Sequence, residues 1–257
     1  MLADIGATEE ELRNGYDAVF HMVTAAKGAE GSYTTENNSA RYETVEEAAA
    51  MDDRFIAAWT GHPHLRVIDN STSFEDKLRR LIGEIRSFLG ETEPMEFRRK
   101  FLVEYPDISW LESYPGCRKQ DIEQIYLLSR EEDELRVRRR GEDGVYTYYK
   151  TLKRYVSDTA RLKMEVRLTE AEYAQLLMEA DPRKRPIRKK RYCLTCEGQF
   201  FEIDIYPFWN DKAIAEVDLS REDEPVRFPE ELKVILEVTG DKNYRIAALA
   251  SLDRQES

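Results

Sequence analysis

Residues 199–220, QFFEIDIYPFWNDKAIAEVDLS, contain two runs in which charged and apolar side chains alternate. In a β-strand, residues two positions apart point to the same face. Glu202 and Asp204 therefore share one face of the first run, and Glu216 and Asp218 share one face of the second. The Asn-Asp pair between the runs is a turn signal. The stretch predicts an antiparallel pair of strands, each with a carboxylate face and an apolar face.

The same alternation recurs in six further runs after Pro94. These runs are 96–105, 122–129, 134–140, 145–155, 161–169 and 187–195. Together with the first two they give eight strand candidates, enough for an antiparallel sheet that closes on itself. Helical stretches are expected at 170–180 and 230–239. The predicted fold class is α+β, with an eight-stranded antiparallel β tunnel and flanking helices.

Nearly every predicted strand carries ionic side chains on one face. The grouped side chains are Glu96, Arg98 and Lys100; Arg136, Arg138 and Arg140; Thr151 and Lys153; Lys163, Glu165 and Arg167; and Lys189 with Arg191. A single such face is normally the solvated side of a sheet, so these faces either all point to water or all line an interior. The interior arrangement requires that cations and anions compensate and that a charged ligand fills the bore. Because Lys and Arg bind phosphate oxygens and carboxylates bind Mg²⁺ or Mn²⁺, it predicts a polyphosphate site with a divalent metal.

The composition narrows the class of protein. The chain has 257 residues, 41% of them hydrophobic, which is enough for a folded core. Its formal net charge of −12 argues against general nucleic-acid binding. No apolar run is long enough to cross a bilayer, and the N-terminus does not have the layout of a secretory signal. Three cysteines are more consistent with reduced thiols than with a disulfide scaffold, so we expect a cytoplasmic protein.

Residues 1–90 have a different pattern from the rest of the chain. Strand-like runs at 16–23 and 64–69 flank a helix-forming stretch at 45–59, and a last helix is expected to begin after Ser73 and end at Gly90. This order predicts a small parallel α/β layer that is incomplete on its own. The polar residues 91–95, which include Pro94, are interpreted as a linker.

Residues 96–250 resemble the CYTH domain of the triphosphate tunnel metalloenzymes, and we assign 96–252 to this domain. The resemblance starts at Glu-Phe-Arg-Arg-Lys (96–100) and continues through Leu-Arg-Val-Arg (135–138), Thr-Leu-Lys (151–153), Lys-Lys-Arg-Tyr (189–192), Phe-Glu-Ile-Asp (201–204) and Ala-Glu-Val-Asp-Leu (215–219). The family includes class IV adenylate cyclase, thiamine triphosphatase and inorganic tripolyphosphatases. The resemblance implies a cytoplasmic protein that binds tripolyphosphate or a nucleoside triphosphate with Mg²⁺ or Mn²⁺.

The resemblance also implies roles for particular side chains. The implied phosphate ligands are Lys100, Arg136, Arg138, Lys153, Lys189 and Arg191, of which Lys100, Arg138 and Lys153 are the implied catalytic residues. The implied metal ligands are Glu96, Glu165, Glu202, Asp204, Glu216 and Asp218. Arg139 and Arg140 are expected to be rim or turn cations.

Two positions depart from the family pattern. Arg98 stands where the family has its second glutamate, and Lys163 stands where a glutamate is common. A cation at these positions removes a metal ligand and places positive charge where the metal would lie. Metal-dependent hydrolysis therefore stays open, and the alternative is a non-catalytic module that binds phosphoinositide or nucleotide.

Residues 16–90 look like the C-terminal part of an AAA-type P-loop nucleotide-binding domain. The similarity lies in YETVEEAAAMDDRFIAAW (42–59) and HPHLRVIDN (62–70). The chain contains no Gly-x-x-x-x-Gly-Lys-Ser/Thr motif, the loop that binds the β- and γ-phosphates. We therefore do not expect nucleotide hydrolysis by this part.

Three other sequence features are not assigned to the binding site. Cys193 and Cys196 have Cys-x-x-Cys spacing without a second pair, so we interpret them as structural. His62 and His64 are expected in a loop or at a strand edge. The basic cluster 183–185 is left free by the implied tunnel positions and could meet an anionic membrane surface.

Overall fold

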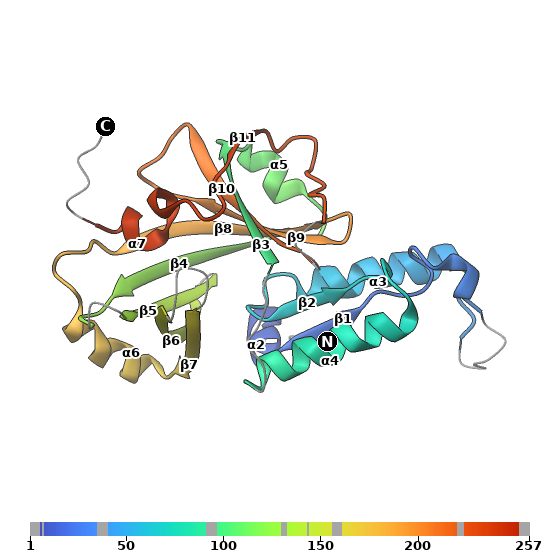
Figure 1. Ribbon diagram of the computed structural model, residues 1–257, viewed down its shortest axis with the longest axis horizontal. Helices are drawn as coiled ribbons and strands as arrows, with labels where there is room; N and C mark the ends of the chain where they lie inside the picture. Colours follow the sequence, from blue (N-terminus) through green and yellow to red (C-terminus); the bar gives the residue numbers. More distant parts are fainter. Residues whose placement is uncertain are drawn as a thin grey trace.

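The computed structural model describes residue 6 and residues 8–34, 41–90, 97–129, 133–142, 144–155, 161–219 and 224–251. Figure 1 shows two parts, a small α/β unit at the N-terminus and a large curved sheet with short helices around it. Within the described residues, no helix has the length and apolar character needed to cross a membrane.

The N-terminal unit has the predicted parallel arrangement. Its elements are α2 (Glu9–Asn14), β1 (Val19–Met22), a 3₁₀ turn (Glu30–Ser32), α3 (Val45–Trp59), β2 (Leu65–Ile68) and α4 (Phe74–Phe88). β1 pairs with β2 in parallel, with Val19 opposite Leu65. Ser73 caps α4 by accepting a hydrogen bond from the backbone of Asp76, and Gly90 follows the helix with φ of +76°. This left-handed conformation favours glycine, so the helix ends where the sequence predicts.

The sheet contains the eight predicted strands and one more. The strands are β3 (Phe97–Glu104), β4 (Arg118–Tyr126), β5 (Asp133–Glu142), β6 (Val145–Tyr155), β7 (Arg161–Leu168), β8 (Ile187–Cys196), β9 (Gln199–Ile205), β10 (Lys212–Leu219) and β11 (Val234–Glu237). Their order is β11-β3-β10-β9-β8-β4-β5-β6-β7, and the neighbouring strands are antiparallel. In the described part of the chain no ladder joins β7 to β11, so the hydrogen-bonded sheet is open where the sequence predicts a closed tunnel.

The ninth strand corrects a helix prediction. Residues 230–239 were expected to be helical, but Val234–Glu237 pairs with the edge of β3, with Leu236 opposite Leu102. Val-Ile-Leu is a good strand sequence, and the free edge of β3 supplies a partner that local sequence does not reveal. The predicted helix at 170–180 is present as α6 (Glu170–Leu176) followed by a 3₁₀ turn (Leu177–Glu179). The other short helices are α5 (Ile108–Ser113), a 3₁₀ turn (Lys242–Tyr244) and α7 (Ile246–Leu249).

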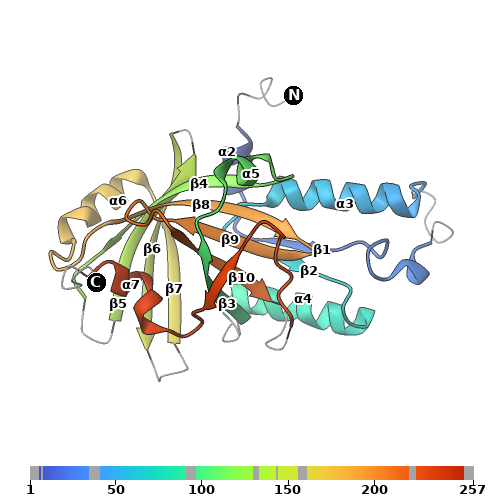
Figure 2. The same ribbon diagram turned by 90° about the horizontal axis from the view of Figure 1, so that it is seen from above.

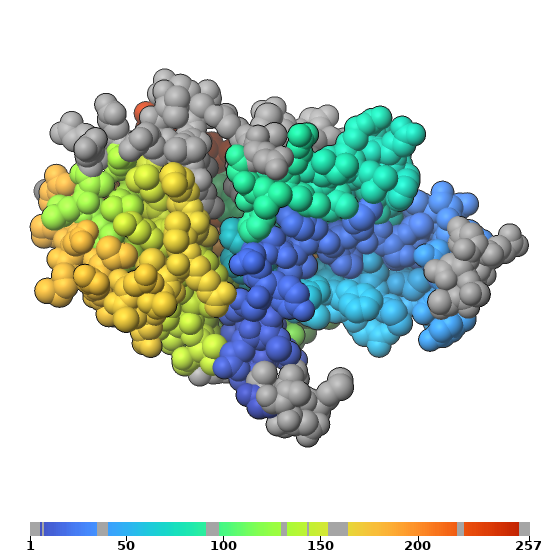
Figure 3. Space-filling view, turned by 90° about the horizontal axis from the view of Figure 1, so that it is seen from below, coloured from blue at the N-terminus to red at the C-terminus, as the bar shows by residue number. Residues whose placement is uncertain are grey.

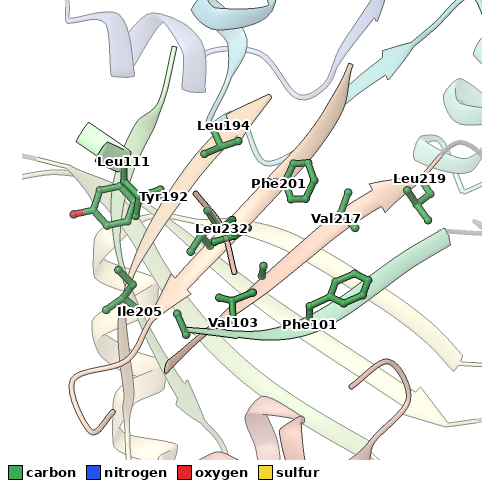
Figure 4. Close-up of a cluster of buried hydrophobic side chains, with 13 residues drawn as sticks. Phe101, Val103, Leu111, Tyr192, Leu194, Phe201, Ile205, Val217, Leu219 and Leu232 are labelled. Atoms are coloured by element: carbon green, nitrogen blue, oxygen red, sulfur yellow. The ribbon is translucent and has the colours of Figure 1, made fainter. Parts of the chain in front are cut away.

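The main hydrophobic core lies on one face of β3, β8, β9 and β10. Figure 4 shows Phe101, Val103, Phe201 and Val217 side by side on these strands. Leu111 of α5 is fully buried against them. This apolar face is therefore covered by α5 and by the segment around Leu232, and the ionic residues of the same strands occupy the opposite face.

The N-terminal unit packs against one end of that ionic face. Leu65 of β2 forms a small buried cluster with Cys193 and Phe200, which lie on the same faces of β8 and β9 as Arg191 and Glu202. Arg167 of β7 donates a hydrogen bond to the carbonyl of Asn14 at 2.8 Å. Figure 3 shows blue N-terminal residues next to yellow residues of the second part, and Figure 2 shows the unit extending from one end of the sheet. The unit therefore covers one end of the ionic face.

Candidate functional site

A cavity of about 300 Å³ lies on the ionic face of the sheet. Its wall includes the six side chains that the resemblance implies as phosphate ligands, which are Lys100, Arg136, Arg138, Lys153, Lys189 and Arg191. They come from β3, β5, β6 and β8, which are distant in sequence. The wall is completed by Gln124, Glu134, Glu216 and the segment 238–247, which ends in α7. Among the described side chains, the cavity therefore brings together the predicted basic set.

Strand register explains why these side chains meet. Arg136 is opposite Thr151, and Glu134 is opposite Lys153. In the same way Lys100 is opposite Glu216, while Arg98 is opposite Asp218. Because paired residues in an antiparallel ladder point to the same face, each register places ionic groups next to one another.

The first side of the cavity, formed by β3, β9 and β10, is rich in acid. We call this group the carboxylate wall: Arg98, Lys100 and Glu216 line the cavity, and Glu202 and Asp218 contact Arg98 without lining it. The guanidinium of Arg98 contacts Asp218 through two hydrogen bonds of 2.6 and 3.1 Å, and it also donates to Glu216 at 3.1 Å and to Glu202 at 3.3 Å. Lys100 Nζ lies 2.7 Å from Glu216. All three carboxylates therefore have a basic partner.

The electrostatics of the carboxylate wall follow from these contacts. Burial alone would raise the pKa of Glu202, but the charges of Arg191 and Arg98 outweigh it and hold this pKa at about 2. Burial also opposes ionisation of Glu216, yet Lys100, Arg98 and Arg191 hold its pKa well below the usual range. These carboxylates are anionic at neutral pH because of the cations around them.

Asp204 lies between this wall and the next strand. It is fully buried and accepts two hydrogen bonds from Arg191, at 2.6 and 2.7 Å, and one from Lys189. Arg191 also contacts Glu202 at 2.5 Å. Burial and the neighbouring charge of Arg191 lower the pKa of Lys189 to about 8, although Asp204 opposes this shift. Much of the positive charge on β8 is therefore compensated within the protein.

The second side of the cavity, formed by β5, β6 and β7, is dominated by arginine. We call this group the arginine wall: Glu134, Arg136, Arg138 and Lys153 line the cavity, and Glu165 contacts Arg138 without lining it. Arg136 has a long contact of 3.4 Å with Glu134, and Arg138 contacts Glu165 at 3.3 Å. The Nε atoms of Arg136 and Arg138 are buried and have no hydrogen-bond partner in the described part of the chain. This wall therefore keeps donor capacity that the carboxylate wall has used.

Repulsion within the arginine wall is visible in the pKa of Arg138. Burial lowers this pKa to about 10, and the neighbouring charges of Arg140, Arg136 and Arg191 act in the same direction, against Glu165. An anion placed between these groups would relieve the repulsion. The arginine wall is thus electrostatically prepared for a negative ligand.

The predicted metal ligands are found in two separate places. Glu202, Glu216 and Asp218 gather around Arg98, whereas Glu165 lies on the far wall, where it also accepts a 2.8 Å hydrogen bond from Thr151 and lies 3.7 Å from His64. Glu96 and the side chain of Lys163 lie outside the described residues. In the part of the chain that is described, no group of three or more His, Cys, Asp or Glu side chains is arranged to hold a metal ion.

Several other predictions concern residues near the cavity. Arg140, expected at a rim, is buried and donates to the Gly61 carbonyl and to Gln120, so it joins the N-terminal unit to the sheet. His64 directly precedes β2, and its Nε2 lies 3.7 Å from a carboxylate oxygen of Glu165. The N-terminal unit is therefore a neighbour of the arginine wall. The sequence did not indicate Gln124, Glu134 or Arg245 as lining residues, because their placement depends on register and on the segment before α7.

The basic cluster 183–185 is partly engaged by the protein itself. Arg183 pairs with Asp181 at 3.0 Å, and Arg185 donates to the Leu249 carbonyl and lies over the ring of Phe208. Lys184 lies over the ring of Tyr126. The free cysteines Cys193 and Cys196 are buried and half-buried respectively.

Comparison with known proteins gives one family model and several solved structures. A family model described as an AAA domain matches residues 4–77. No curated protein matches the chain. Among solved structures, the chain is similar to the inorganic triphosphatase NE1496, with 28% identity and a TM-score of 0.42 over 61% of this chain and 95% of that one.

Two further solved structures are more distant. The PH1012 protein from Pyrococcus horikoshii is 19% identical, with a TM-score of 0.36 over 50% of this chain and 82% of its own. A Hippeastrum protein described as a putative adenylyl cyclase with a dominant triphosphatase activity is 12% identical, with a TM-score of 0.33 over 49% of this chain and 80% of its own.

Proposed function

We propose that this protein binds a short polyphosphate, either tripolyphosphate or the triphosphate group of a nucleotide, in the cavity between the two walls. The observation that carries the proposal is the convergence of six basic side chains from four strands on one cavity of about 300 Å³. Cations with no common ligand would be spread over the solvent-exposed face of the sheet. Their collection around one cavity requires an anionic ligand or internal carboxylates.

The charge balance of the cavity favours a polyanion. Its lining contains eight basic side chains, Arg98, Lys100, Arg136, Arg138, Lys153, Lys189, Arg191 and Arg245, and three acidic ones, Glu134, Glu216 and Asp241. Four more carboxylates contact these cations without lining the cavity, namely Glu165, Glu202, Asp204 and Asp218. The lining side chains alone carry five more positive than negative charges, and the four outer carboxylates reduce this excess to one. A triphosphate offers several charged oxygens that can contact β3, β5 and β6 at once, and charge-assisted hydrogen bonds of this type are the strong ones.

The arginine wall supplies the specific contacts in this proposal. Arg136 and Arg138 line the cavity with planar guanidinium groups, whose shape suits phosphate oxygens. Lys153 on the neighbouring strand adds a point charge to the same wall. Lys189 and Arg191 also line the cavity, and they stay paired with Asp204.

A divalent metal does not fit the carboxylates in the arrangement described. Glu202, Glu216 and Asp218 have the hard oxygen ligands that Mg²⁺ and Mn²⁺ prefer, but each of them already contacts Arg98. Asp204 and Glu165 are likewise engaged, by Arg191 and Arg138. The proposal is therefore one of binding, and metal-dependent hydrolysis is an outcome that the experiment distinguishes.

Calorimetric titration with tripolyphosphate and with ATP tests the proposal, and orthophosphate release is measured in parallel with EDTA, Mg²⁺ or Mn²⁺. We expect saturable binding at one site per chain, and weaker binding by Arg136→Gln. Release of orthophosphate only with Mg²⁺ or Mn²⁺ would identify a hydrolase in the same cavity. Absence of saturable binding under all three conditions would refute the proposal.

A further inference from the structure

Arg98 has an unusual set of neighbours for a surface strand. Its guanidinium contacts three different carboxylates from two other strands, and the shortest of these contacts joins Nε to Asp218 at 2.6 Å. Asp218 is bound through both of its oxygens, whereas Glu202 and Glu216 each contribute one. The side chain is about one third exposed, at 34%, so it also borders the cavity.

Three carboxylates brought this close together require a cation. Mutual repulsion would otherwise raise the pKa of at least one of them, and a divalent metal is the usual alternative to a basic side chain. Here the guanidinium of Arg98 is that cation, and it contacts all three carboxylates. It is held in place by ionic hydrogen bonds.

A metal ion and this guanidinium cannot occupy the same position. The carboxylate oxygens nearest to the centre of the cluster accept hydrogen bonds from Arg98, and Lys100 and Arg191 add positive charge at 2.7 Å from Glu216 and 2.5 Å from Glu202. A divalent ion would have to displace Arg98 and would then face two further cations. Coulomb repulsion and the loss of the Arg98 hydrogen bonds both oppose this exchange.

We propose that Arg98 is a built-in replacement for a divalent metal, so that the cavity binds its polyphosphate without Mg²⁺ or Mn²⁺. The inference rests on the proposed function, because it concerns how the same cavity holds its ligand. Arg98 neutralises Glu202, Glu216 and Asp218, the role a metal would have, so that these carboxylates do not repel the anionic ligand next to them. Its replacement by glutamate would add a fourth carboxylate and convert this wall into a metal site.

The first test measures metal binding without any phosphate ligand. Wild-type protein, Arg98→Glu and the control Arg99→Glu are titrated with Mn²⁺ by calorimetry and by electron paramagnetic resonance. Arg99 is the adjacent residue on the opposite face and pairs with Glu237. We expect weak Mn²⁺ binding by the wild type and the control, and at least tenfold tighter binding by Arg98→Glu.

The second test measures tripolyphosphate affinity in EDTA and in Mg²⁺. The inference predicts that the wild type binds in EDTA, and that Arg98→Glu binds only when the metal is present. Wild-type binding that requires Mg²⁺ would overturn the inference and leave the proposed function intact. No wild-type binding in either buffer would overturn the proposed function, while the Mn²⁺ titrations would still report on Arg98.

Folding of the variants is checked by circular dichroism. If Arg98→Glu does not fold, Arg98→Gln decides the first test, because it removes the cation without adding an acid. Folded Arg98→Gln is expected to bind Mn²⁺ more tightly than the wild type. Equal Mn²⁺ affinity in the wild type and in a folded Arg98 variant would contradict the inference.

Discussion

The carboxylate wall and the arginine wall face the same cavity, but their cations differ in how many acidic side chains they contact. On the carboxylate wall, Arg98 contacts three acids, and Lys100 lies 2.7 Å from the Glu216 oxygen that Arg98 does not contact. On the arginine wall, Arg136 has a 3.4 Å contact with one acid and a buried Nε without a partner among the described residues. The comparison teaches that counting cations does not locate a binding surface. A cation with several internal partners maintains the structure, and one with unused donors is available to a ligand.

The largest effect is expected when a compensated cation is removed. Arg191→Ala leaves Asp204 and Glu202 buried with one basic partner fewer each. Breaking a buried ion pair typically costs about 3–5 kcal/mol, and we expect a loss of this size in the free energy of unfolding, measured with a chemical denaturant. The control is Arg188→Ala, an exposed neighbour on the same strand whose pair with Glu123 is expected to contribute about 1 kcal/mol or less. Equal losses for the two variants would remove the distinction between compensated and solvated cations.

A cation of the arginine wall should affect ligand affinity more than stability. Arg136→Gln removes the charge and retains a side chain that can donate hydrogen bonds. A charge-assisted hydrogen bond contributes about 1.5–3 kcal/mol, so we expect tripolyphosphate affinity to fall by about 10- to 100-fold. Calorimetric titration measures the affinity, and thermal unfolding confirms that the variant is folded. An unchanged affinity would show that the arginine wall does not contact the ligand.

The contact between the N-terminal unit and the sheet should depend on pH through His62. Burial lowers the pKa of His62 below its ordinary value of 6.5, and the charges of Arg140 and Arg13 act in the same direction, against a hydrogen bond to the Tyr16 carbonyl. Because the unfolded chain takes up this proton first, stability should be complete above pH 6.5 and should decrease as the pH falls through that value.

The measurement is the free energy of unfolding at about pH 8 and about pH 5.5, for wild type and for His62→Gln. The wild type is expected to lose more stability between these two conditions than the variant does. The same loss in both proteins would indicate that His62 takes up its proton equally well in the folded and unfolded states.

The smallest effect is expected on the outer face. Arg99 pairs with Glu237 at 2.9 Å in an exposed position, one residue from both Arg98 and Lys100. Surface pairs of this kind contribute about 0–1 kcal/mol, so Arg99→Gln should change stability by no more than this and should leave tripolyphosphate affinity unchanged. A clear loss of affinity in this variant would mean that the two faces of β3 are not separated as described.

The sequence predicted the parts of the fold that depend on local pattern. The alternation in 145–155 and 199–206 identified β6 and β9 and the side chains that share their faces, and α3 was predicted with the observed bounds. Local pattern could not reveal that Val234–Glu237 would pair with the edge of β3, because this strand is stabilised by a partner more than a hundred residues away. The open order of the sheet was missed for the same reason.

The sequence could not show which side chains of different strands lie next to each other in the site. Alternation placed Arg98, Lys100, Glu216 and Asp218 on common faces, and their neighbours followed only from the register of β3 against β10. The substitution at Arg98 was visible in the sequence, but its three carboxylate partners were not. Glu134 lies in β5 on the same face as Arg136, so the alternation could have identified it, whereas Arg245 lies in the segment before α7, where no strand pattern applies.

A crystal structure of the protein grown with tripolyphosphate and EDTA tests the central claim most directly. The account predicts density for the anion between the two walls, with phosphate oxygens within hydrogen-bond distance of Arg136, Arg138 and Lys153, and with Arg98 still on Glu202, Glu216 and Asp218. An anion bound elsewhere on the protein, or a cavity that stays without it at saturating ligand, would contradict the account.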